Sequence, residues 1–178
     1  MEKTLERCIG FYEGSQRDTL LICFGAMHGN EPAGLRAIEL VIKMLEIEPY
    51  KNRDFKFKGK IVGLIGNRQA FQKKQRFLRK DLNRKFIEKD IQDLRKKPHS
   101  ELEAEDRELI EVIEAVEAEI AAYKPKKLVI LDLHTTSSYG GIFTICRRDP
   151  EAIRIATALH APVVLGMLDG LRGTTLHY

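Results

Sequence analysis

The sequence predicts an α/β fold, with a mostly parallel or mixed central sheet and helices on its faces. Apolar runs of strand length alternate with longer amphipathic segments, a pattern typical of this class. The runs KIVGLIG and KLVILDLH are almost continuously apolar, as expected of strands covered on both faces. With 178 residues, 43% of them hydrophobic, the chain can bury one core. We therefore expect residues 1–178 to form a single domain.

The first half of the chain contains three predicted strands and one helix. Residues 7–12 and 19–25 flank the turn-rich EGSQRD, so we expect these two strands to pair as a hairpin. A helix should begin at Pro32, because proline suits the first helical turn. Residues 60–66 form the next buried strand. The apolar stripe of the helix comprises Leu35, Ile38, Val41, Ile42 and Leu45.

The second half begins with a long polar loop and then turns helical. Ser100 and Glu103 have the spacing of a capping box, which predicts a helix start there. Residues 127–134 form a buried strand, and IFTIC and APVVLG are two further strands around a short helix over residues 150–159. The buried side of the long helix comprises Leu102, Leu109, Ile113, Val116 and Ile120.

Charge is unevenly distributed although the net charge is only +4. Residues 68–85 contain eight basic residues and one acid, whereas residues 101–119 contain nine acids and one arginine. Each block fits a solvated face, and the two could partly neutralise each other across the fold.

The cysteines and the N-terminus bear on location. Three cysteines without C-x-x-C spacing argue against a disulfide framework. The N-terminal MEKTLER carries charges where a signal peptide needs an apolar stretch, and no apolar run approaches the roughly 18 residues of a membrane span. We expect a soluble, cytoplasmic protein.

Candidate metal ligands follow two of the predicted strands. In open α/β sheets, ligands bind beyond the carboxyl ends of the strands, which points to residues 28–31, 67–85 and 134–141. His28 and Glu31 follow one strand and His134 another, so parallel strands would bring all three to one edge. Two histidines and a carboxylate are a common catalytic zinc set with an open position. A His and a Glu three residues apart also occur by chance, and His134 alone could be an ordinary surface histidine.

Three short motifs narrow the interpretation. H-G-N-E occupies residues 28–31, D-L-N-R residues 81–84 and D-L-H residues 132–134. In these motifs and their order, the chain resembles the succinylglutamate desuccinylase/aspartoacylase family, zinc hydrolases related to the zinc carboxypeptidases. The resemblance extends over residues 19–141. It implies a zinc-carboxypeptidase-like α/β fold.

The resemblance also implies a metal site. One Zn²⁺ per chain would be bound by His28, Glu31 and His134. Asp132 could orient a ligand imidazole, as metal sites often require, or it could be an ordinary carboxylate at the end of a strand.

The implied activity is hydrolysis of the amide bond of a small N-acyl amino acid. By the resemblance, Asn83 and Arg84 would anchor a substrate carboxylate, a group that guanidinium binds well. Arg76, seven residues before Asn83, would stabilise the oxyanion that develops on the scissile carbonyl. Arg79 is a competing candidate for that role.

The general base is unassigned. In the family it is a separate glutamate on a strand well beyond D-L-H. The acids after His134 are Asp149, Glu151 and Asp169, and none of them lies in a comparable segment. We therefore expect the domain to be incomplete at its C-terminus and the chain alone to lack its base.

Other functions remain open. A metallocarboxypeptidase that cleaves peptides, or a non-catalytic zinc-binding protein, would use the same ligands. A nucleic-acid-binding module could use the basic loop 68–85, with Phe71, Phe77 and Phe86 as stacking groups. That alternative leaves H-G-N-E and D-L-H unexplained, so nucleic acid is not the partner we expect. The sequence indicates neither the acyl group nor the oligomeric state.

Overall fold

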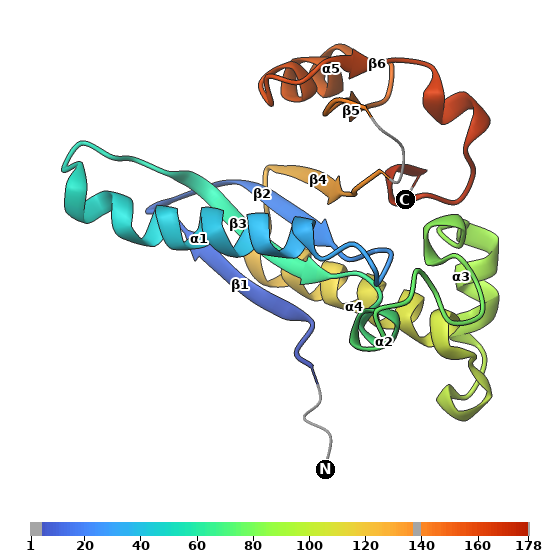
Figure 1. Ribbon diagram of the computed structural model, residues 1–178. Helices are drawn as coiled ribbons and strands as arrows, with labels where there is room; N and C mark the ends of the chain where they lie inside the picture. The colour runs from blue at the N-terminus through green and yellow to red at the C-terminus, as the bar shows by residue number, and fades with distance from the viewer. Residues whose placement is uncertain (1–4, 137–139, 178) are drawn as a thin grey trace.

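The computed structural model describes residues 5–136 and 140–177 (Figure 1). Its main sheet has the strand order β1-β3-β2-β4, and β2 runs parallel to both of its neighbours. β1 is antiparallel to β3. The predicted α/β class, with a mostly parallel central sheet, is thus confirmed. The strands are β1 (Cys8–Glu13), β2 (Gln16–Gly25), β3 (Lys58–Ile65) and β4 (Lys127–Leu133).

The predicted hairpin between the first two strands is wrong. β1 pairs with β3, where Phe11 lies opposite Val62, and β3 separates β1 from β2. β2 is buried from Ile22 to Gly25 and uses both of its edges for parallel partners, β3 and β4. No edge of β2 is left for β1, and the half-exposed β1 instead lies at the border of the sheet.

Two long helices cover the two faces of the sheet (Figure 1). α1 (Ala33–Lys51) packs on the face that contains Cys23, and α4 (Ala104–Tyr123) packs on the face that contains Ile22. Successive strand residues point to opposite faces, so the apolar run of β2 supplies both cores. The stripe of α1 is confirmed except at Val41, which is 43% exposed.

The start of α4 differs from the prediction. The helix begins at Ala104, and Glu103 is its N-cap residue but makes no capping hydrogen bond through its side chain, which pairs with Lys80 instead. Ser100 lies in the 3₁₀ helix η2 (His99–Glu101). The acidic block is also not a simple solvated face, because Glu105 and Glu108 are almost completely buried. These carboxylates turn inward because backbone N–H groups of the preceding loop are available to them.

The polar loop between β3 and α4 is locally structured. It contains α2 (Arg68–Gln72), the 3₁₀ helix η1 (Leu82–Arg84) and α3 (Glu88–Arg95). Its basic residues partly pair with the acids of α4, as expected: Lys80 Nζ lies 2.8 Å from Asp106 Oδ2, and Arg68 pairs with Glu111.

The C-terminal part forms a small separate layer beside β4 (Figure 1). The two predicted strands are present only as the parallel two-residue strands β5 (Thr144–Ile145) and β6 (Val163–Val164), which do not join the main sheet. The predicted short helix is confirmed as α5 (Pro150–Thr157). After η3 (Met167–Gly170), the 3₁₀ helix η4 (Thr175–His177) returns to β4. Within the described ranges, none of the helices is both long and apolar enough to span a membrane.

Candidate metal centre

Two parallel strands deliver the predicted ligands to one edge of the sheet. Gly25, the last residue of β2, lies opposite Leu133, the last residue of β4. His134 follows directly after β4, and His28 and Glu31 lie in the turn between β2 and α1. Because the strands end together, the three side chains converge. Of the predicted loop 134–141, residues 137–139 lie outside the described part of the chain.

The glycine of H-G-N-E has a packing role. A Cβ atom on Gly29 would lie 2.1 Å from the backbone carbon of Ala70 in α2, so a larger residue could not be accommodated there. The Gly29 N–H also donates to the carbonyl oxygen of Arg76, at 3.1 Å. The turn that carries His28 is therefore held directly against the basic loop.

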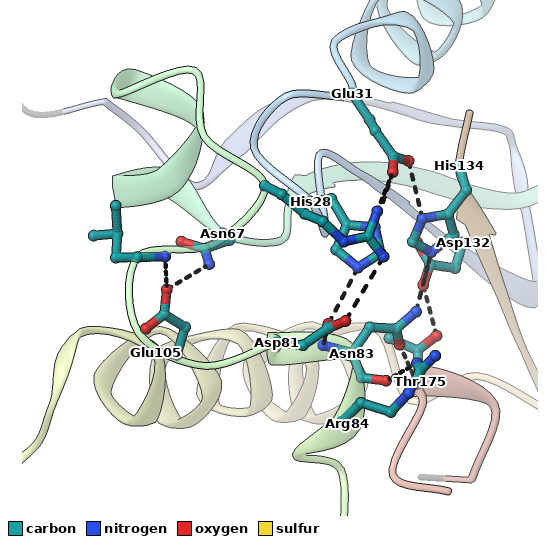
Figure 2. A network of polar contacts seen from close by, with 12 residues as sticks. His28, Glu31, Asn67, Asp81, Asn83, Arg84, Glu105, Asp132, His134 and Thr175 are labelled. Carbon is teal, nitrogen blue, oxygen red and sulfur yellow. Dashed lines mark hydrogen bonds and ion pairs between the residues drawn. The ribbon is translucent and has the colours of Figure 1, made fainter. Parts of the chain in front are cut away.

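The carboxylate of Glu31 lies between the two imidazoles (Figure 2). Glu31 Oε1 is 2.9 Å from His28 Nδ1, and Glu31 Oε2 is 3.1 Å from His134 Nδ1. The backbone N–H of Thr135 donates to Oε2 at 2.8 Å. One ligand atom from each of the three residues lies within 4.8 Å of the others, as a shared cation would require.

A second carboxylate holds the far nitrogen of each imidazole. His28 Nε2 is 3.1 Å from Asp81 Oδ1, and His134 Nε2 is 3.0 Å from Asp132 Oδ2. A carboxylate at Nε2 favours the proton there and leaves the Nδ1 lone pair, on the side of Glu31, free to bind a metal. Asp132 thus has the position of an orienting group. The contact of Asp81 was not anticipated, although this residue is the first of the D-L-N-R motif.

The electrostatics of the cluster favour added positive charge. Burial alone would lower the pKa of His134, but its contacts with Asp132 and Glu31 outweigh burial and raise the pKa to about 10. The pKa of His28 is likewise raised against burial by Asp81 and Glu31. Burial opposes ionisation of Glu31, yet the two histidines and the Thr135 N–H hold its pKa well below the ordinary value. The neighbouring carboxylates stabilise positive charge on the two imidazoles, and a bound divalent cation would bring positive charge to the same place. The donor set therefore fits a divalent metal.

The D-L-N-R segment lies against the cluster. Asp81 accepts the Asn83 N–H at 3.0 Å and so begins η1. The buried Asn83 side chain has its Nδ2 atom 3.2 Å from His134 Nε2, while its Oδ1 atom accepts the Thr175 N–H at 3.1 Å. Arg84 is exposed and donates to the Asn83 carbonyl oxygen at 2.7 Å.

Thr175 is a second residue that the sequence did not single out. Its hydroxyl donates to Asp132 Oδ2 at 2.7 Å, so this threonine supports the carboxylate that holds His134. The contact joins a segment about 40 residues further along the chain, and no local pattern indicates it.

The two candidate arginines differ in position. Arg76 Nη1 lies 3.4 Å from Glu31 Oε1, and Arg76 Nη2 lies 3.7 Å from Asp81 Oδ2. Its side chain is 49% exposed, so it borders the cluster and still faces solvent. The exposed guanidinium of Arg79 makes no hydrogen bond or ion pair with the residues that the structure describes. The structure therefore brings Arg76, and not Arg79, to the cluster.

The later acids lie elsewhere. Glu151 Oε1 is 2.5 Å from Lys127 Nζ, at the opposite end of β4 from His134. Asp149 caps α5 by accepting the Ala152 N–H at 2.8 Å, and Asp169 pairs with Arg148 on the surface at 3.2 Å.

A centre of two histidines and one carboxylate, at the carboxyl edge of a parallel sheet, defines the class as an α/β protein with a candidate metal site. The chain belongs to the succinylglutamate desuccinylase/aspartoacylase family: residues 16–178 match the family model for the "Succinylglutamate desuccinylase/Aspartoacylase catalytic domain". The predicted resemblance is thereby confirmed.

Individual relatives are similar at lower identity. A probable aspartoacylase from Nostoc sp. is 26% identical over 136 residues, which cover 76% of this chain and 42% of that protein. The succinylglutamate desuccinylase structure from Vibrio cholerae matches 89% of this chain and 44% of its own, at 16% identity and a TM-score of 0.59. That from Chromobacterium violaceum matches 90% and 50%, at 21% identity and a TM-score of 0.56. The structural matches show the shared fold, and the chain spans about half the length of these relatives or less.

Proposed function

We propose that the protein is a zinc-dependent hydrolase that cleaves the linear amide bond of an N-acyl amino acid. The observation that carries the proposal is the convergence of His28, Glu31 and His134, with a carboxylate behind each imidazole. Family membership supports deacylation, and the names of the relatives suggest N-acylaspartate or N-succinylglutamate as substrate. A cytoplasmic location is part of the proposal and is supported by three free cysteines.

The proposed metal is one Zn²⁺ per chain. The Nδ1 atoms of His28 and His134 and the carboxylate of Glu31 would bind it. When bound, zinc would supply a water of lowered pKa and a Lewis acid for the amide carbonyl. Asp81 and Asp132 would keep the two imidazoles oriented by accepting their Nε2 protons.

The remaining proposed roles follow from position and charge. Arg76 borders the cluster and is half exposed, so its guanidinium is available to a substrate carbonyl whose oxygen becomes negative during hydrolysis. Asn83 and Arg84 would anchor a substrate carboxylate beside the metal. The exposure of Arg84 next to the buried Asn83 supports a role in contacting the substrate.

We further propose that residues 1–178 act as one zinc-hydrolase domain and that the general base is a carboxylate from outside them. Asp149, Glu151 and Asp169 are each committed to a cap or an ion pair away from the cluster. Activity is therefore best measured in a form of the protein long enough to match its relatives.

The central experiment combines metal analysis with a substrate panel. Purified protein should contain about one zinc per chain and should hydrolyse N-acetyl-L-aspartate or N-succinyl-L-glutamate, but not short peptides. Removal of the metal with a chelator should abolish turnover, and added zinc should restore it. Cleavage of peptides without deacylation would point to a metallocarboxypeptidase instead. Zinc binding without any turnover would point to a non-catalytic zinc protein.

Nucleic acid is not a partner in this proposal. Three of the basic residues in loop 68–85 already pair with acids of α4, namely Arg68, Lys80 and Lys85. Their charge is thus partly neutralised within the fold, which weakens the electrostatic footprint that a nucleic acid requires. A salt-dependent shift in the electrophoretic mobility of single-stranded RNA or DNA on addition of the purified protein would contradict the proposal that nucleic acid is not a partner.

Asp132→Ala should weaken zinc binding by about 10-fold to 100-fold, because His134 would lose the carboxylate that fixes its ring. Competition with a coloured zinc chelator would measure the affinity. Asp169→Ala is the matched control, since Asp169 is an exposed aspartate that pairs only with Arg148 among the described residues. An unchanged affinity in Asp132→Ala would remove the orienting role.

Arg84→Ala should mainly raise KM, by roughly tenfold or more, because a charge-assisted contact to the substrate carboxylate is lost in both ground and transition states. Steady-state kinetics with the active substrate would measure the effect. A fall in kcat at constant KM would instead assign Arg84 to the transition state.

Glu151→Gln should leave kcat within about twofold, since an exposed side chain at the far end of β4 cannot reach the proposed site. Zinc content should also be unchanged. A loss of kcat by a factor of about 100 or more would identify Glu151 as the general base. It would also overturn the proposal that the general base lies outside residues 1–178.

A further inference from the structure

We infer that Glu105 is a positioning residue that clamps the backbone of residues 78–80 and thereby fixes Arg76 and Asp81 beside the metal centre. The inference rests on the proposed function for the roles of those two side chains. The clamp itself is a feature of the described fold and can be tested separately.

Glu105 is fully buried in the first turn of α4, and both of its carboxylate oxygens are used. Oε1 accepts the N–H of Leu78 at 2.6 Å, and Oε2 accepts the N–H groups of Arg79 and Lys80 at 3.1 and 3.3 Å. Figure 2 shows this carboxylate also facing the side chain of Asn67, whose Nδ2 atom lies 3.4 Å from Oε1. One side chain thus binds three consecutive backbone amides.

Within the described part of the chain, the Glu105 carboxylate is satisfied by hydrogen-bond donors and not by a cation. Among the described residues Glu105 forms no ion pair, and a buried charge without partners is strongly unfavourable. Its partners are instead N–H groups, which bind carboxylates in short, charge-assisted hydrogen bonds. The amino-terminal end of α4 adds a favourable dipole. A neutral side chain could not satisfy the same four donors.

The clamped segment lies directly between two parts of the site. Arg76 precedes it and is tied to Gly29 through its carbonyl oxygen, while Asp81 follows it and contacts His28. Residues 75–81 form neither helix nor strand, so regular hydrogen bonding does not hold them. Without the Glu105 carboxylate, the amides of residues 78–80 would lose their acceptors or would have to move.

Glu108 offers a matched control in the same helix. It is 1% exposed and accepts the N–H groups of Arg68 and Gln69, at 3.1 and 3.3 Å. Its Oε2 atom also binds Arg7 at 2.7 Å. Glu108 therefore secures the start of α2 and not residues 78–80. A substitution at Glu108 therefore shows how much stability is lost when any buried glutamate of α4 is disturbed, without removing the acceptor of residues 78–80.

Amide hydrogen exchange tests the clamp directly. In the wild-type protein, the amides of Leu78, Arg79 and Lys80 should exchange slowly despite lying outside helices and strands. Glu105→Gln replaces one acceptor oxygen by an NH₂ group that faces other donors, so exchange at these amides should become at least about tenfold faster. Glu108→Gln should change their exchange by less than about threefold while accelerating exchange at the start of α2. Unprotected amides in the wild type, or equal acceleration by Glu108→Gln, would overturn the clamp.

A second readout links the clamp to the site. Zinc content should remain about one per chain in Glu105→Gln, because the three ligands come from the ends of β2 and β4. Calorimetric affinity for N-acetyl-L-aspartate or N-succinyl-L-glutamate, whichever the wild type binds, should fall by about tenfold or more, and Glu105→Asp should recover part of it. Faster exchange with unchanged affinity would refute the positioning role. A wild-type protein that binds neither zinc nor either probe would instead refute the proposed function, while the exchange data still judge the clamp.

Discussion

His134→Ala should lower the affinity for Zn²⁺ by roughly a hundredfold or more, and His28→Ala should have a similar effect. A four-ligand structural zinc site is stabilised by about 10–16 kcal/mol, so one ligand contributes roughly 3 kcal/mol, which corresponds to about two powers of ten in affinity. The loss should be visible both as zinc content after dialysis and in competition with a chelator. Each histidine also contacts Glu31, so either substitution leaves that carboxylate with one imidazole fewer.

His99→Ala provides the control for these substitutions. His99 is exposed and lies in η2, away from the carboxyl edge of the sheet, so zinc content and affinity should not change. If His28→Ala and His134→Ala both retain zinc at wild-type affinity, the ligand assignment is wrong, whatever the activity of the protein.

Arg76→Ala should lower kcat by about 100-fold to 1000-fold and change KM much less, because the loss of an oxyanion donor acts on the transition state. Arg76 borders the cluster, with Nη1 3.4 Å from Glu31 Oε1. The measurement is steady-state hydrolysis of the preferred N-acyl amino acid by zinc-loaded protein. Zinc content should be unaltered, which separates this effect from loss of the metal.

Arg79→Ala is the matched variant, three residues further along the same loop. Among the described residues, only its backbone N–H is held, by Glu105 at 3.1 Å, and alanine preserves that N–H. Its kcat should therefore stay within about threefold of the wild type. Strong damage from Arg79→Ala together with none from Arg76→Ala would exchange the roles of the two arginines.

Much of the site could be predicted from the sequence because its parts follow local patterns. The strands β2 and β4 are recognisable as apolar runs, although β4 was predicted to be buried on both faces and is only partly buried because it lies at the border of the sheet. Parallel strands must also end at a common edge. These runs are followed closely by His28, Glu31 and His134. Predicting that the three side chains converge therefore required only the direction of the strands. The resemblance to the family assigned Arg76 and Asn83 to the candidate site, and the structure brings both to the cluster of His28, Glu31 and His134.

The strand order could not be predicted in the same way. Turn residues between β1 and β2 favour a hairpin locally, yet the order is decided by which strands can be covered on both faces and paired on both edges. β2 satisfies that condition with β3 and β4, and β1 is left at the border beside β3.

The sequence by itself determined the α/β class and the family, and it indicated the candidate metal ligands, since these depend on residue types in short motifs and at the ends of apolar runs. Only the tertiary structure decided which distant groups support the ligands: Asp81 behind His28, Thr175 behind Asp132, and Glu105 turned inward from a helix whose acids resemble a solvated face. The physical reason is that a buried polar group must find a partner, and the partner that lies within reach depends on packing between segments far apart in the chain.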